Sequence, residues 1–138
     1  MAESQEDLVN WSISKAEEYL NSARDNLSRD RYFVAAEEIF RSIETSLEAL
    51  LYKSGIKRIE YPGTREKFTG RLALQFLVRD NLVAAGKLDS SIYNKYLELA
   101  SALHLRGYRY GKFTKKDLEK AMEFAEELFY KAKAQIRK

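Results

Sequence analysis

The segment from His104 to Lys116 gathers the side chains of this chain that are best suited to chemistry. His104 is the only histidine, and an imidazole titrates near neutral pH, so it can accept or donate a proton. The segment has no acidic residue, and aromatic rings alternate with its cations. Cations beside stackable rings suit the phosphates and bases of a nucleic acid. The predicted binding residues are Arg106, Tyr108, Arg109, Tyr110, Lys112, Lys115 and Lys116.

Two simpler interpretations of this segment stay open. His104 can sit at a helix end and bond a nearby carboxylate or carbonyl group, and the rings can pack on the core beneath an ordinary solvated turn. Lys115 and Lys116, however, fall in the first turn of a predicted helix, where positive charge opposes the helix macrodipole. A locally unfavourable choice of this kind indicates a second purpose for the two lysines.

Two further charged groups give weaker functional signals. Basic side chains flank the only proline, Pro62, and we interpret them as a scattered, solvated surface. A row of glutamates would bind metal only with matching carboxylates from other helices, and no Glu-x-x-His pairing accompanies it. We therefore expect no metal site and no cofactor. The basic group is Lys53, Lys57, Arg58, Arg65, Lys67 and Arg71, and the glutamates are Glu37, Glu38, Glu44 and Glu48.

Trp11, Tyr32 and Phe33 are aromatic residues near the predicted first helical hairpin, and they also allow two interpretations. If they pointed outward together, they would form an exposed apolar patch for a partner. We predict instead that they form the core and rim of the hairpin.

Composition limits the classes of function. The chain has 138 residues, which predicts one domain spanning 1–138. It has no cysteine, so thiolate catalysis, zinc–thiolate sites and disulfides are excluded. No apolar run is long enough to cross a bilayer, and the N-terminus does not resemble a signal peptide, so we expect a cytoplasmic protein without a membrane partner. A net charge of +3 does not by itself predict a nucleic-acid partner.

Hydrophobic periodicity indicates helices that must position these residues. A capping-box pattern from Ser4 to Asp7 opens the first helix, which we expect to end near 28–29. Asp30 is the predicted N-cap of the second, and Gly55 its C-terminal stop. Apolar residues recur every three or four positions along both helices. The predicted stripes are Ile13, Ala16, Leu20, Ala23 and Leu27, then Ala36, Phe40, Ile43, Leu47 and Leu50, with a second row of Ala35, Ile39, Ser42, Ser46 and Ala49.

Three more helices follow, and no segment alternates as a strand would. The third is expected over 65–85, the fourth is capped by Asp89 or Ser90, and the last opens with a capping box at 114–117. Short links between helices imply antiparallel neighbours, so the predicted fold is an all-α, antiparallel bundle of four or five helices. Inward residues are Phe68, Leu72, Phe76 and Val83, then Ile92, Tyr96, Leu99 and Leu103, then Leu118, Ala121, Ala125, Leu128 and Ala132.

The sequence pattern of these helices resembles that of the HEPN superfamily (higher eukaryote and prokaryote nucleotide-binding), and most closely that of its archaeal PaREP group. Those proteins pair an alanine-bearing helix with a second alanine-rich helix that stops at a Lys-x-Gly-like sequence. A Leu-His pair followed by aromatic residues resembles the PaREP segment. The matching stretches are Lys15–Ala23, Arg29–Ala36, Ile39–Gly55 and Ala100–Tyr110.

The resemblance implies a homodimer and a partner that is a nucleotide, a nucleic acid or a protein such as a nucleotidyltransferase. Many HEPN domains are metal-independent ribonucleases, with an arginine four to six residues before a histidine. Here the only histidine is His104, and the nearest arginine before it is Arg79. The sequence therefore favours a non-catalytic binding module that uses the basic aromatic turn. The alternative is a divergent, toxin-like ribonuclease in which His104 is the candidate catalytic residue.

Overall fold

Five α-helices and one pair of very short strands make up the computed structural model over the residues that it describes, 4–61, 68–102 and 114–137. The predicted all-α helical bundle is confirmed. The helices are α1 (Gln5–Ser28), α2 (Tyr32–Lys53), α3 (Gly70–Val78), α4 (Ser90–Ala100) and α6 (Lys115–Ile136), and the strands are β1 (Glu60–Tyr61) and β2 (Phe68–Thr69).

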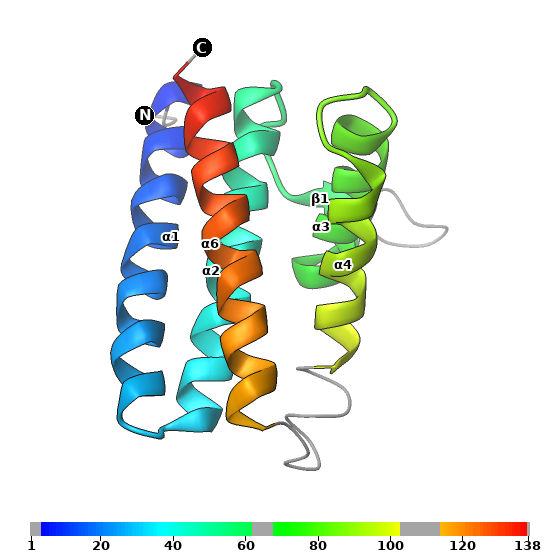
Figure 1. Ribbon diagram of the computed structural model, residues 1–138. Helices are drawn as coiled ribbons and strands as arrows, with labels where there is room; N and C mark the ends of the chain where they lie inside the picture. The colour runs from blue at the N-terminus through cyan, green and yellow to red at the C-terminus, as the bar shows by residue number, and fades with distance from the viewer. Residues whose placement is uncertain (1–3, 62–67, 103–113, 138) are drawn as a thin grey trace.

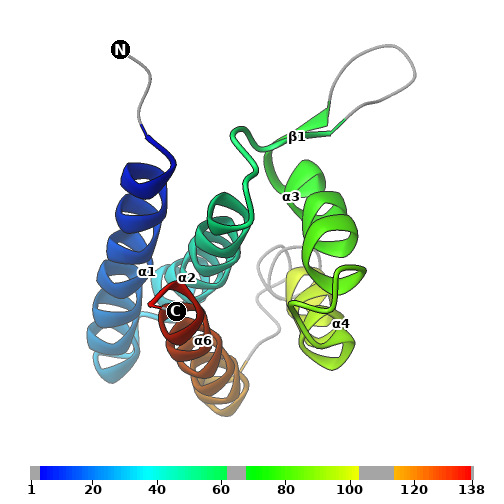
Figure 2. The same cartoon turned by 90° about the horizontal axis from the view of Figure 1, so that it is seen from above.

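The helices form two layers (Figure 1). The long helices α1, α2 and α6 pack into a triangle, and α3 and α4 lie together against α2 on its far side from α1 (Figure 2). α6 runs antiparallel to α1, because its first residue lies beside the end of α1 and its last turn lies beside Gln5. In the described part of the chain, no helix is long and apolar enough to cross a membrane.

Most of the predicted helix ends and buried faces are confirmed. Capping boxes close the N-termini of α1 at Ser4 and of α6 at Thr114, and Asp89 caps α4 by accepting a hydrogen bond from the Ser91 amide. Both predicted rows of α2 are buried. The second row meets α1 closely, since the hydroxyl of Ser42 donates to the carbonyl of Ala16 at 3.2 Å. Small side chains there allow this close approach between helices.

The prediction that Asp30 caps α2 is wrong. Arg31 occupies the cap position, and Asp30 adopts a left-handed backbone with φ of 59°. An N-cap residue needs extended backbone so that its side chain can reach the following amides. Asp30 instead makes the tight reversal between α1 and α2, and its carboxylate accepts a hydrogen bond from the hydroxyl of Tyr32.

The third predicted helix is shorter than expected. Two residues pair antiparallel with β1 before α3 begins at Gly70, and α3 continues into a single π-helical turn over Arg79–Val83. Leu72, predicted inward, is 45% exposed. The residues that actually pack inward are Ala73, Leu74, Leu77, Val78 and Leu82.

Candidate functional site

The turn between α1 and α2 and the beginning of α6 meet at one end of the bundle. Nζ of Lys115 lies 3.2 Å from Oδ1 of Asp30, although the two residues are 85 positions apart in the chain. This contact places the described part of the predicted basic segment, Lys115 and Lys116, beside the first turn of α2. Figure 1 shows this end of the molecule, where the blue-to-cyan turn and the orange start of α6 lie side by side.

Exposed side chains of α2 share this end. Phe33 is 57% exposed and Val34 is 50% exposed, so the prediction that Phe33 belongs to the core or rim is wrong. Phe33 falls three residues before Ala36 in the buried row of α2, yet more than half of its surface is exposed. Arg31 beside it is exposed as well. A cation and an aromatic ring are therefore both exposed near the start of α2.

Cations and helix N-termini gather at this end beside two carboxylates, Asp30, which pairs with Lys115, and Asp117 in the first turn of α6. Arg31, Lys115 and Lys116 are exposed, and the N-termini of α2 and α6 both point here. In the described structure Arg31 makes no capping hydrogen bond with its side chain, and the first turn of α2 holds no acidic residue. Helix N-termini carry a partial positive charge that attracts anionic groups, and the C-terminal end of α1 offsets only part of it.

Most of the other predicted site residues fall outside the part of the chain that the structure describes. Those of the predicted turn that fall outside it are His104, Arg106, Tyr108, Arg109, Tyr110 and Lys112. Arg65 and Lys67 of the second basic group fall outside it as well. Lys53, Lys57 and Arg58 of that group are exposed. Arg71 is not part of an open basic surface, because it forms ion pairs with carboxylates of α2.

Those ion pairs form a charged cluster between α2 and α3 that the sequence analysis did not predict. The guanidinium of Arg71 contacts Glu37 at 3.1 Å and Glu44 at 3.0 Å. Glu44 is only 5% exposed, and burial raises its pKa to about 7 even though Arg71 opposes the shift. A usable signal was present, because Glu44 follows Phe40 by four residues and so lies on the buried face of α2.

A model of the HEPN domain matches residues 9–135, which covers α2, α3 and α4 in full and most of α1 and α6. The chain belongs to the HEPN family. No curated protein matches the chain.

An exposed aromatic ring also lies on α1 of this HEPN domain. Trp11 is 57% exposed on α1, against the prediction of a core or rim position, and the ammonium of Lys15 lies 4.0 Å from its ring centroid. A cation over an indole face is a favourable electrostatic contact.

Among the residues described, no group of three or more histidine, aspartate or glutamate side chains is arranged to hold a metal ion.

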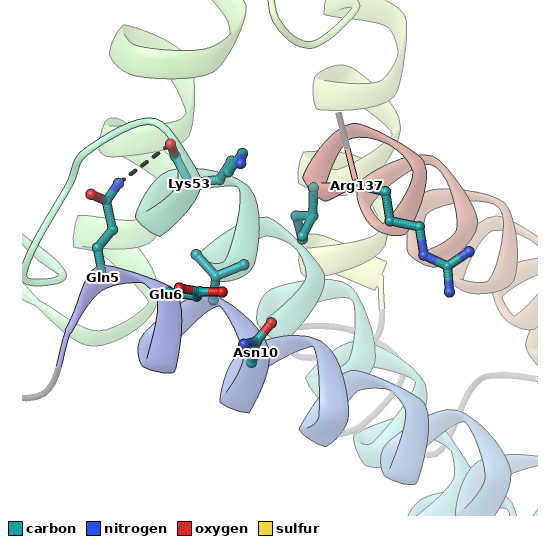
Figure 3. Close-up of a pocket in the computed structure, with 7 residues that line it drawn as sticks. Gln5, Glu6, Asn10, Lys53 and Arg137 are labelled. Atoms are coloured by element: carbon teal, nitrogen blue, oxygen red, sulfur yellow. Dashed lines mark hydrogen bonds between the residues drawn. The ribbon is translucent and has the colours of Figure 1, made fainter.

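A pocket lies at the end of this HEPN domain opposite to the contact of Lys115 with Asp30 (Figure 3). It has a volume of about 650 Å³ and lies between the first turn of α1 and the last turns of α2 and α6. The amide of Gln5 donates to the Tyr52 and Lys53 carbonyls, which closes the end of α2. Figure 3 shows the head groups of Lys53 and Arg137 directed apart, so they do not converge on a shared anion.

Proposed function

We propose that this HEPN domain, as one unit spanning 1–138, is a non-catalytic module that binds single-stranded nucleic acid. Its interface is the basic end, which we define as Arg31, Phe33, Lys115 and Lys116 together with the predicted residues of segment 103–113. The observation that carries the proposal is the contact of Lys115 with Asp30. Because of it, exposed cations far apart in sequence, Arg31 and the pair Lys115 and Lys116, lie at the same end of the bundle as the exposed ring of Phe33.

The chemistry of this end supports a polyanionic ligand with accessible bases. Lysine and arginine displace counterions from phosphates, which makes such binding weaken steeply as salt is added. A ring such as Phe33 offers a stacking surface to an unpaired base, whereas bases inside a duplex are already stacked. Single strands are therefore the expected ligands. Tyr108 and Tyr110 of the predicted turn would add stacking partners.

The sequence around His104 supports binding in preference to catalysis. The positions four to six residues before it hold Glu98, Leu99 and Ala100, so the arginine of the HEPN ribonuclease pattern is missing. Without that cation, charge that develops on a phosphate in the transition state would lack its expected stabilisation. A divergent ribonuclease that uses His104 remains the alternative. The Leu-His pair and the aromatic residues up to Tyr110 support placement in the PaREP group.

Self-association is a second part of the proposal, and it rests on the family. The apolar surface of α2 does not support it, because other helices of the same chain bury both of its rows. Light scattering at micromolar concentration should give a mass near twice the 16.0 kDa of one chain. A mass that stays at one chain up to the highest soluble concentration would exclude a homodimer.

Fluorescence anisotropy with labelled single-stranded RNA at two salt concentrations tests the nucleic-acid proposal. The double variant Arg31→Ala, Lys116→Ala should bind several-fold more weakly than the native chain and show a shallower salt dependence. Lys57→Ala, Arg58→Ala removes the same charge from the second basic group and serves as the matched control, which should bind as the native chain does. Equal affinity of all three proteins would reject the basic end as the interface.

Incubation with total RNA in the absence of metal separates the two functions. The non-catalytic module should leave the RNA intact while binding it. RNA cleavage that is lost in His104→Ala would establish the ribonuclease instead.

A further inference from the structure

Arg71 links the second layer of helices to the first through ion pairs. Within the described residues, the ion pairs that join α3 to α2 both pass through its guanidinium, where Nη2 contacts Glu37 and Nε contacts Glu44. The same guanidinium lies 5.5 Å from the ring centroid of Phe40. The two carboxylates differ in their surroundings, because the Glu37 side chain is 32% exposed whereas that of Glu44 is 7% exposed.

Glu44 is enclosed by groups from α2, α3 and α4. Arg41 and Glu48 flank it on α2, Arg71 faces it from α3, and Tyr96 of α4 is near enough for its hydroxyl to interact electrostatically with the carboxylate. Lys15 of α1 acts on Glu48 in the same cluster. A cavity of about 340 Å³, lined by Arg41, Glu44, Glu48, Ile59, Gly70, Arg71 and Leu74, opens between α2 and α3 at this point.

Leu74, Val78 and Tyr96 belong to the same core as α2, but the two layers approach each other over fewer residues than the helices of the α1–α2–α6 triangle do. Figure 2 shows α3 and α4 standing beside α2 as a separate pair. Elements with few buried contacts are the ones that open locally before the whole fold unfolds. Moving α3 away from α2 would expose the carboxyl of Glu44 to water.

We propose that Glu44 is a proton-linked latch: its protonated form keeps the α3–α4 layer closed on α2, and its ionisation makes that layer easier to open. Closing the layer strips water from a carboxylate, and Arg71 does not fully compensate for the lost hydration. Proton binding removes the charge and with it the penalty.

The direction of the effect follows from linkage. The pKa of Glu44 is about 7 when the layer is closed, with burial as the largest cause, and it returns toward the ordinary 4.5 when the carboxyl reaches water. The closed form therefore binds the proton more tightly, so acid favours closure and pH above 7 favours opening. Burial also raises the pKa of Glu48, which acts in the same direction. A simple ion-pair latch would show the opposite dependence and open in acid.

Amide hydrogen exchange of the full chain tests the latch without reference to any ligand. At each pH, amides of α3 and α4 should exchange sooner than those of α1 and α2, because opening of the layer precedes global unfolding. After correction for the intrinsic exchange rate, protection of α3 and α4 should fall about 30-fold from pH 5.5 to pH 8. Equal protection in both layers would mean that no separate opening occurs and would overturn the proposal.

Glu44→Gln is the informative variant, since the amide mimics the protonated carboxyl. It should hold the high protection of α3 and α4 at pH 8 and remove most of the pH dependence. Glu126→Gln, which removes a carboxylate paired with Arg24 on the other layer, should leave that dependence intact. If Glu44→Gln keeps the native pH dependence, Glu44 is not the latch.

A second variant protects the test against misfolding of the first. Arg71→Gln removes the cation that lowers the pKa of Glu44, so the pH at which protection falls should move upward. A midpoint that stays in place, or moves downward, would contradict the assignment.

Discussion

The ring of Tyr96 on α4 stacks on the ring of Phe40 on α2, with their centroids 6.1 Å apart and their planes 18° from parallel. Both side chains are fully buried, and the pair joins the two layers of the bundle at its centre. Among the described residues the hydroxyl of Tyr96 has no hydrogen-bond partner, which is unusual for a buried polar atom. Packing of the ring, rather than its hydroxyl, therefore holds the layers together here.

Tyr96→Phe should change the free energy of unfolding little, or raise it by up to about 1 kcal/mol, because it removes an unpaired buried hydroxyl. Tyr96→Ala should lower it by about 3–5 kcal/mol, because it leaves a cavity beside Phe40. Urea unfolding followed by circular dichroism measures both. A large loss of stability in Tyr96→Phe would show that the hydroxyl has a partner.

Glu44 should make the whole fold less stable as pH rises. Its folded pKa is raised to about 7 from 4.5 in the unfolded chain, so the native state binds the proton more tightly. The contribution is complete in acid and is lost as the pH rises from about 4.5 through 7, which amounts to roughly 3 kcal/mol. Urea midpoints at pH 5 and pH 8 measure this fall. Glu44→Gln should flatten the profile between those two values, and an unchanged slope would contradict this assignment.

Asp30 should tolerate glycine better than a branched residue. A left-handed backbone destabilises a residue that has a Cβ by about 1–2 kcal/mol, whereas glycine adopts it without this penalty. Asp30→Gly loses the exposed contact with Lys115 but removes the backbone strain at the turn. Asp30→Val loses the same contact and keeps a side chain that disfavours the left-handed backbone. Thermal unfolding should therefore rank the glycine variant clearly above the valine variant. The reverse order would show that the φ of 59° is not adopted in solution.

Phe33 should matter for ligand binding and not for stability. Because its side chain is 57% exposed, Phe33→Ala should leave the thermal midpoint nearly unchanged. If the ring stacks on a base, binding of single-stranded RNA should weaken by about 1–3 kcal/mol while duplex binding stays the same. Trp11→Ala removes an equally exposed ring from a distant part of α1 and is the matched control. A similar loss in both variants would point to a non-specific contribution.

The local signals of this sequence were sufficient for most of the scaffold. Capping boxes at Ser4 and Thr114 and the apolar rows of α1, α2 and α6 depend on residues within a few positions of one another, and each was confirmed. The third helix was predicted poorly, because the strand pair before Gly70 and the π turn after Val78 break its three-four period. Lys115 and Lys116, which the sequence analysis proposed as binding residues, are both exposed, and their role in binding stays a prediction.

Tertiary structure alone decided which of these residues meet. Neither the contact of Lys115 with Asp30 nor the pairing of Arg71 with Glu44 has a local pattern, since the partners are 85 and 27 residues apart. Exposure of Phe33 likewise depends on which helices cover the first turn of α2, although its position in the row predicts burial. Helix periodicity specifies a direction around one axis, whereas burial, ion pairing and a shifted pKa depend on what the other helices place in that direction.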